Sequence, residues 1–213
     1  MNKNAPLVVL DCDSTSIREE VIEIIAKTAG SYEEVKTITD AAMRGEYDFA
    51  ESLKARVATL KGVPESVFEQ TAKQLNFNPG FTELVEAVHA RNGHIAVVSG
   101  GFLEVLDLVM PAQKVDVWHA NRLTVADGKL TGTVSGEIVT AATKADYLKK
   151  WAAEFGTPLS HTIAVGDGAN DIEMMRIAAI SVGYQAKPAV REVADYCFDD
   201  TLAHIIPLLD RLG

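Results

Sequence analysis

The sequence predicts an α/β fold, a doubly wound parallel sheet with an inserted helical-bundle cap and a small β-hairpin. The short apolar runs at 7–10, 94–98 and 162–165 lack polar alternation, which indicates strands buried on both faces. From residue 79 onward such runs alternate with helical patterns, as expected for parallel strands joined by right-handed crossovers. Residues 31–78 show helical periodicity but no convincing strand, so we interpret them as an insertion.

Charge and composition limit the possible partners. The 213 residues are 47% hydrophobic and carry a formal net charge of −10, which argues against a nucleic-acid partner because such partners favour a basic face. No run approaches the roughly twenty apolar residues of a membrane span, and we expect a cytoplasmic protein, either monomer or homodimer. Cys12 and Cys197 are expected to be buried free thiols.

Several local signals set the expected boundaries of the elements. Ser16 and Glu19 have the spacing of a capping box for a helix that ends at Gly30. Pro64 suits the first turn of a helix, and residues 127–128, Asp-Gly, predict a hairpin turn between strands 121–125 and 129–134. The other elements are expected as helices at 33–43, 49–60, 64–75, 81–91, 102–109, 144–155, 172–178, 189–193 and 202–209, and as strands at 115–118, 180–182 and 196–198.

Polar residues follow three of the predicted strands. Asp11 and Asp13 follow the first, residues 99–101 (Ser-Gly-Gly) the second, and residues 167–171 the third. Taken singly, each suits an acidic turn, a helix cap or a tight turn, and Lys144 alone is most simply a solvated lysine. Because the carboxyl ends of parallel strands meet at one edge of a sheet, we expect all of these groups to share one site.

Together these groups suit phosphoryl transfer. Asp11, Asp13 and Asp167 supply the hard oxygen ligands that Mg²⁺ prefers. The hydroxyl and amides of residues 99–101, expected at a helix N-terminus, and the charge of Lys144 can hold phosphate oxygens. The sequence has no base beside a serine or cysteine nucleophile and no Walker loop, so a carboxylate is the natural nucleophile.

The motifs Asp11-Cys12-Asp13-Ser14-Thr15, Ser99-Gly100-Gly101, Lys144 and Gly166-Asp167-Gly168-Ala169-Asn170-Asp171 resemble, in order, the four motifs of the haloacid dehalogenase-like phosphatases. Further similarity at residues 51–57, 120–132 and 186–188 extends the resemblance over about residues 7–209. The resemblance implies a Rossmann-like core at 1–15 and 79–213 and a helical cap at 16–78. It also implies Mg²⁺-dependent hydrolysis of a small phosphomonoester, O-phospho-L-serine, in the last step of serine biosynthesis.

The resemblance implies a role for each matching residue. Asp11 would attack phosphorus and become an aspartyl-phosphate, and Asp13 would protonate the leaving oxygen and later activate water. Glu20 would take the substrate ammonium and Arg56 its carboxylate. Mg²⁺ would bind Asp11, the backbone carbonyl of Asp13 and Asp167, with support from Asp171. The phosphoryl group would be surrounded by Ser99, Gly100, Lys144 and Asn170. The site would be closed by Met43 and Phe49.

The residues alone are also compatible with different roles and different proteins. Glu20 and Arg56 suit solvated helix faces as well, and Met43 and Phe49 suit the core of the helical bundle. A sister phosphatase acting on another small phosphomonoester, such as phosphohomoserine, would share the same core. A receiver-like signalling module would also combine aspartates, Mg²⁺, a hydroxyl and a lysine, but it needs neither a second carboxylate two residues after the phospho-acceptor nor a helical lid.

Overall fold

The computed structural model describes residues 5–43 and 46–212, except for the side chain of Met43. Its seven-stranded sheet has the order β4-β3-β2-β1-β5-β6-β7, and every neighbouring pair is parallel except β3 and β4. The predicted doubly wound parallel sheet is therefore confirmed. Its strands are β1 (Leu7–Leu10), β2 (His94–Phe102), β3 (Val117–Ala126), β4 (Lys129–Ser135), β5 (Thr162–Gly166), β6 (Ile180–Tyr184) and β7 (Tyr196–Phe198).

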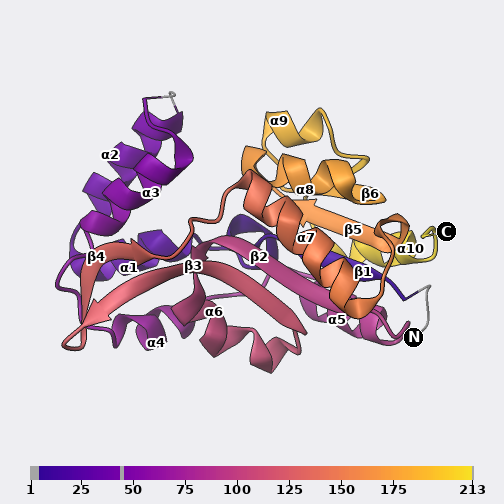
Figure 1. Cartoon of the computed structure of the whole chain (residues 1–213), viewed down its shortest axis with the longest axis horizontal. Helices are drawn as coiled ribbons and strands as arrows, with labels where there is room; N and C mark the ends of the chain where they lie inside the picture. Colours follow the sequence, from indigo (N-terminus) through magenta and orange to yellow (C-terminus); the bar gives the residue numbers. More distant parts are fainter. Residues whose placement is uncertain (1–4, 44–45, 213) are drawn as a thin grey trace.

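Helices cover both faces of the sheet. Figure 1 shows α7, α8 and α9 on one side of the strands and α5 and α6 on the other. None of the helices in the described part of the chain is long and apolar enough to cross a membrane. The helices are α1 (Val21–Ala29), α2 (Tyr32–Met43), α3 (Phe49–Ala58), α4 (Val67–Ala72), α5 (Phe81–His89), α6 (Leu103–Val109), α7 (Ala141–Phe155), α8 (Ile172–Ile177), α9 (Pro188–Arg191) and α10 (Ile206–Leu209).

The central strand β1 is buried on both faces, as its unbroken apolar sequence predicts. Val8 and Leu10 pack into the apolar cluster that includes residues of α1, α5 and α6, whereas Leu7 and Val9 pack into a second cluster with α7 and α8. All four side chains are fully buried, and each contributes about 1.5–3 kcal/mol of hydrophobic stabilisation. This packing on two faces fixes the position of the residues that leave the carboxyl end of β1.

Helices α1 to α4 all lie between β1 and β2 in the chain, and Figure 1 shows α2 and α3 projecting beside the sheet. The segment after α3 pairs with the β3–β4 hairpin. The amide of Gly62 donates to the carbonyl of Leu130, and the amide of Leu130 donates to the carbonyl of Val63, each at 2.8 Å. The helical insertion is thereby fastened to the hairpin.

Two predicted helix starts are wrong. Ser16 does not cap a helix with Glu19, because its hydroxyl donates to the carbonyl of Asp11 at 2.6 Å and α1 begins only at Val21. Pro64 does not open a helix either, because it forms an isolated bridge to the hairpin and α4 begins at Val67. In both places, tertiary contacts outweigh the local capping signal.

The region around β3 also differs from prediction. The expected strands 115–118 and 121–125 are one strand, whose register with β2 shifts between Ala120 and Asn121. Asn121 is buried, and its polar atoms are satisfied. Its side-chain amide donates to the carbonyl of Gly100, and its Oδ1 accepts from the amide of Val139, each at 2.8 Å. The hairpin turn at 127–128 is confirmed, and both of its residues have positive φ. Most other elements differ from expectation only at their ends; residues 202–205 form a 3₁₀ turn before α10.

Candidate active site

The polar residues predicted at the ends of three strands converge as expected, because β2, β1 and β5 are adjacent in the sheet. Asp11 directly follows β1, and Asp167 directly follows β5. After Asp11 the chain makes a tight turn over Cys12–Ser16, in which Ser14 takes a left-handed conformation with φ of 58°. This turn reverses the chain towards α1 and leaves both Asp11 and Asp13 at the edge of the sheet.

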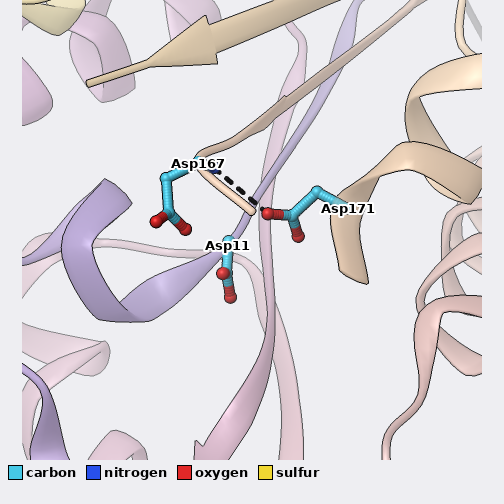
Figure 2. Close-up of side chains that lie close together, drawn as sticks. All are labelled: Asp11, Asp167 and Asp171. Atoms are coloured by element: carbon cyan, nitrogen blue, oxygen red, sulfur yellow. Dashed lines mark hydrogen bonds between the residues drawn. The ribbon is translucent and has the colours of Figure 1, made fainter. Parts of the chain in front are cut away.

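Three aspartates form a buried acidic cluster (Figure 2). Asp11, Asp167 and Asp171 are at most 6% exposed, and one carboxylate oxygen of each lies within 4.8 Å of the others. Oδ2 of Asp171 accepts the amides of Asp167 and Gly168, each at 3.1 Å. Carboxylates gathered this closely in a buried site are costly unless cations lie beside them or one of them stays protonated, and hard oxygens in this number suit a divalent ion such as Mg²⁺.

Lys144 is a fully buried member of this cluster and not a solvated lysine. Its Nζ lies 2.7 Å from Oδ1 of Asp11 and 2.8 Å from Oδ1 of Asp171. Burial lowers the pKa of Lys144, but the two carboxylates outweigh burial and raise it above its usual value. Burial and the charge of Asp171 raise the pKa of Asp11 to about 7, against the opposing effect of Lys144.

Asp13 occupies a different environment from Asp11. Its Oδ1 accepts the amide of Val21 at 3.2 Å, and burial together with the charges of Glu20 and Asp11 raises its pKa well above the usual range. Burial also raises the pKa of Glu20, whose Oε1 accepts the hydroxyl of Ser14 at 2.7 Å. The two aspartates of the turn therefore differ: one is paired with an ammonium, and the other faces further carboxylates.

Residues 99–101 belong to β2, and the prediction that their amides form a helix N-terminus is wrong. The next helix, α6, begins at Leu103, and the buried Ser99 does not cap it. Instead, Oγ of Ser99 accepts the amide of Gly101 at 2.8 Å. A Cβ on Gly100 would lie 3.1 Å from Cζ of Phe49, so the Phe49 ring covers this strand end.

A cavity of about 690 Å³ opens above the acidic cluster. Its lining includes Asp11, Asp13, Gly100, Asp167 and Asn170 from the edge of the sheet and Glu20, Phe49 and Arg56 from the helical insertion. Nε of Arg56 donates to the carbonyl of Ser52 at 3.3 Å, and burial lowers the pKa of Arg56. The structure thus brings these predicted core and cap residues together around one cavity, whereas Ser99, Lys144 and Asp171 are fully buried and do not line it. The side chain of Met43, at the end of α2, lies outside the described residues.

Several other side chains line the cavity without a role in the sequence-based predictions, among them Lys187 and Ser52. Nζ of Lys187 lies 2.9 Å from Oδ2 of Asp167, although its segment, residues 186–188, is part of the family resemblance. Ser52 lines the cavity and is nearly fully buried. Both thiols are free, as expected. Cys12 is buried, and burial raises its pKa, but the expectation that Cys197 is buried is wrong, because it is partly exposed.

Comparison with known proteins agrees with this geometry. The sequence model of the haloacid dehalogenase-like hydrolases matches residues 8–176. A phosphoserine phosphatase of Streptococcus thermophilus is 47% identical over 214 residues, covering 100% of both chains. Two solved structures, a phospho-aspartyl intermediate analogue and a substrate-bound complex of phosphoserine phosphatase, each have a TM-score of 0.89 and 40% identity, covering 96% of this chain and 98% of the other.

Proposed function

The chain belongs to the haloacid dehalogenase-like hydrolase family, and on this basis we propose that it hydrolyses O-phospho-L-serine to L-serine and phosphate with Mg²⁺. The observation that carries the proposal is the pairing of Asp11 with the buried Lys144 beside a second carboxylate, Asp13, at the floor of a cavity. Membership of a hydrolase family favours a phosphatase over the receiver-like module. The reaction supplies serine and corresponds to the last step of serine biosynthesis.

In the first step, Asp11 acts as the nucleophile. A carboxylate oxygen of Asp11 bonds to phosphorus as the bond from phosphorus to the serine oxygen breaks, which gives an aspartyl-phosphate and serine. The serine oxygen takes the proton of Asp13, and burial together with the charges of Glu20 and Asp11 favours the protonated form of that carboxyl by raising its pKa. Lys144 keeps Asp11 oriented and contributes positive charge beside the transferring group.

In the second step, Asp13 acts as a base. It takes a proton from a water molecule, whose oxygen attacks phosphorus while the bond from phosphorus to Asp11 breaks. Phosphate leaves, and both aspartates return to their starting states. Ser99, Gly100 and Asn170 would hold the phosphoryl oxygens through both steps. Gly100 and Asn170 line the cavity together with Asp11, which supports this role for them.

The donor set suits Mg²⁺. Asp11, Asp167 and the backbone carbonyl of Asp13 would hold the ion, which would offset the negative charge of the phosphoryl oxygens. Asp171 would not bind the ion directly but would orient the groups around it, because Lys144 and two backbone amides already occupy its oxygens. The cavity lining contains more carboxylates than cationic side chains, which also favours a bound cation.

The helical insertion would bind the ammonium and carboxylate groups of the substrate. Glu20 would take the substrate ammonium, and the planar fork of Arg56 would take its carboxylate. Both side chains line the same cavity as Asp11, Asp13 and Asp167. Phe49 and Met43 would cover the bound substrate and exclude water.

We further propose that residues 1–15 and 79–213 form the catalytic core and residues 16–78 a cap that closes the cavity. The packing of β1 between two apolar clusters supports the core, and the placement of α1 to α4 between β1 and β2 supports the cap. The protein would act in the cytoplasm as a monomer or a homodimer, on a small molecule and without a nucleic-acid partner.

The direct test is phosphate release from O-phospho-L-serine by the purified chain, with Mg²⁺ or with EDTA. A panel with phosphohomoserine, phosphothreonine and phosphoethanolamine identifies the preferred ester. We expect steady, Mg²⁺-dependent turnover with phosphoserine preferred. Preference for another ester would leave the proposed catalytic roles in place but contradict phosphoserine as the substrate. The absence of turnover on every ester would contradict the proposed phosphatase activity.

A further inference from the structure

Two lysines contact the acidic cluster, and the protein holds them very differently. Lys144 is fully buried and paired with both Asp11 and Asp171. The side chain of Lys187 is 56% exposed, and its Nζ lies 2.9 Å from Oδ2 of Asp167. Among the described residues, Asp167 is the one carboxylate within ion-pair distance of Lys187. Lys144 is therefore a fixed part of the site, whereas Lys187 can leave it.

The backbone of Lys187 is anchored independently of its side chain. Its amide donates to the carbonyl of Asp167 at 2.8 Å, and its carbonyl accepts the amide of Arg191 at 3.2 Å in the first turn of α9. Movement of the ammonium away from Asp167 needs only rotamer changes of an exposed side chain, which are fast and inexpensive. No rearrangement of the loop is required.

Asp167 is at the same time one of the carboxylates that suit a divalent ion. Mg²⁺ approaches a carboxylate oxygen to about 2.0–2.1 Å, and an ammonium on the same carboxylate would repel it. Without the ion, an unpaired Asp167 would face the carboxylates of Asp11 and Asp171. Lys187 relieves that repulsion with an ammonium that lines the cavity and is more than half exposed.

We propose that Lys187 is a displaceable counter-ion of the metal site. It pairs with Asp167 while the site holds no metal, and it gives up that carboxylate when Mg²⁺ binds. Lys187 therefore stabilises the metal-free protein and weakens its affinity for Mg²⁺. This inference rests on the Mg²⁺ site of the proposed function and concerns binding of the metal alone, so it can be tested without substrate.

The test is calorimetric titration of the metal-free full chain with MgCl₂. Lys187→Met removes the ammonium and keeps most of the apolar stem. Lys149→Met is the matched control, because it removes the same charge from a lysine on α7 that is 54% exposed and paired with Asp146. We expect Lys187→Met to lower the dissociation constant for Mg²⁺ by about three- to tenfold and Lys149→Met to leave it unchanged.

Thermal unfolding gives a second readout. In EDTA, Lys187→Met should unfold at a lower temperature than the wild type, and Mg²⁺ should raise its unfolding temperature by more. Unchanged or weaker Mg²⁺ binding by Lys187→Met would overturn the proposal, and so would equal tightening by Lys149→Met. If the wild type does not bind Mg²⁺ at all, the metal site of the proposed function is wrong. If the wild type binds Mg²⁺ but Lys187→Met binds it no more tightly, only the role of Lys187 is wrong.

Discussion

The ammonium of Lys144 lies 2.7 Å from Oδ1 of Asp11, and the lysine side chain has no exposure to solvent. Oδ1 of Asp11 also accepts the amide of Cys12 at 2.7 Å, so this oxygen is held from two directions. The same ammonium reaches Asp171, which in turn binds the amides of Asp167 and Gly168. The nucleophile proposed here is therefore positioned by a network that includes the strand end of β5.

The first prediction concerns this buried pair. Lys144→Met should lower the free energy of unfolding at pH 8 by about 3–5 kcal/mol, because it leaves Asp11 and Asp171 charged and unpaired in a buried site. At pH 5.5 the loss should be smaller, since Asp11, whose pKa burial raises to about 7, can then take up a proton. Urea unfolding at the two pH values measures both effects. The exposed control Lys149→Met should change stability little, and an equal loss for Lys144→Met at both pH values would contradict the network.

The second prediction concerns pH and metal binding. Because the pKa of Asp11 is raised from 3.8 to about 7 in the folded protein, its ionisation destabilises the metal-free fold as pH rises from about 4 to about 7. Mg²⁺ needs the ionised carboxylate, so its apparent dissociation constant should fall about tenfold between pH 6 and pH 8. Calorimetric titration at the two pH values tests this expectation, and an affinity independent of pH would contradict it.

The third prediction compares two adjacent glycines in β2. A Cβ on Gly101 would lie 2.8 Å from Oδ2 of Asp13, whereas a Cβ on Gly100 would meet the far end of the Phe49 ring at 3.1 Å. Gly101→Ala should therefore displace the carboxylate of Asp13, the proposed acid–base group, and lower kcat by about 100-fold. Gly100→Ala should act mainly on KM, because the partly exposed ring can move. Steady-state kinetics separate the two, and equal effects on kcat would contradict the geometry.

The fourth prediction concerns Arg56. Arg56→Ala should raise KM for phosphoserine by about 10- to 100-fold, since it removes the charge-assisted hydrogen bond that we propose between Arg56 and the substrate carboxylate. Phosphoethanolamine lacks that carboxylate and should lose little. Arg56→Lys serves as the matched variant that keeps the charge but not the planar fork. A similar loss for both substrates would show that Arg56 acts on the protein and not on the carboxylate.

Much of the core could be predicted from sequence because its signals are local. The apolar run of β1 and the residues after it specify a buried strand that ends in carboxylates, and the structure places Asp11 there. The start of α1 could not be predicted in the same way. The hydroxyl of Ser16 has two possible partners, a helix amide or the carbonyl of Asp11, and the turn that decides between them is a tertiary feature.

Contacts within the candidate site are equally hard to predict from local sequence patterns. Lys144 is an ordinary lysine in an amphipathic helix until α7 packs against the strand ends and buries it between two carboxylates. Lys187 contacts Asp167 only because β6 lies beside β5 and returns the chain to the same edge of the sheet. Such contacts depend on the order of strands, which no local pattern contains.

Isotope exchange tests most directly whether phosphoserine hydrolysis passes through phosphate bound to Asp11. The enzyme is incubated with O-phospho-L-serine, Mg²⁺ and labelled L-serine, and the label that appears in phosphoserine is measured. A covalent intermediate that outlives serine release predicts labelled phosphoserine, and Asp11→Asn should abolish both exchange and turnover. Turnover without exchange in the wild type, or exchange that persists in Asp11→Asn, would contradict an aspartyl-phosphate at this residue.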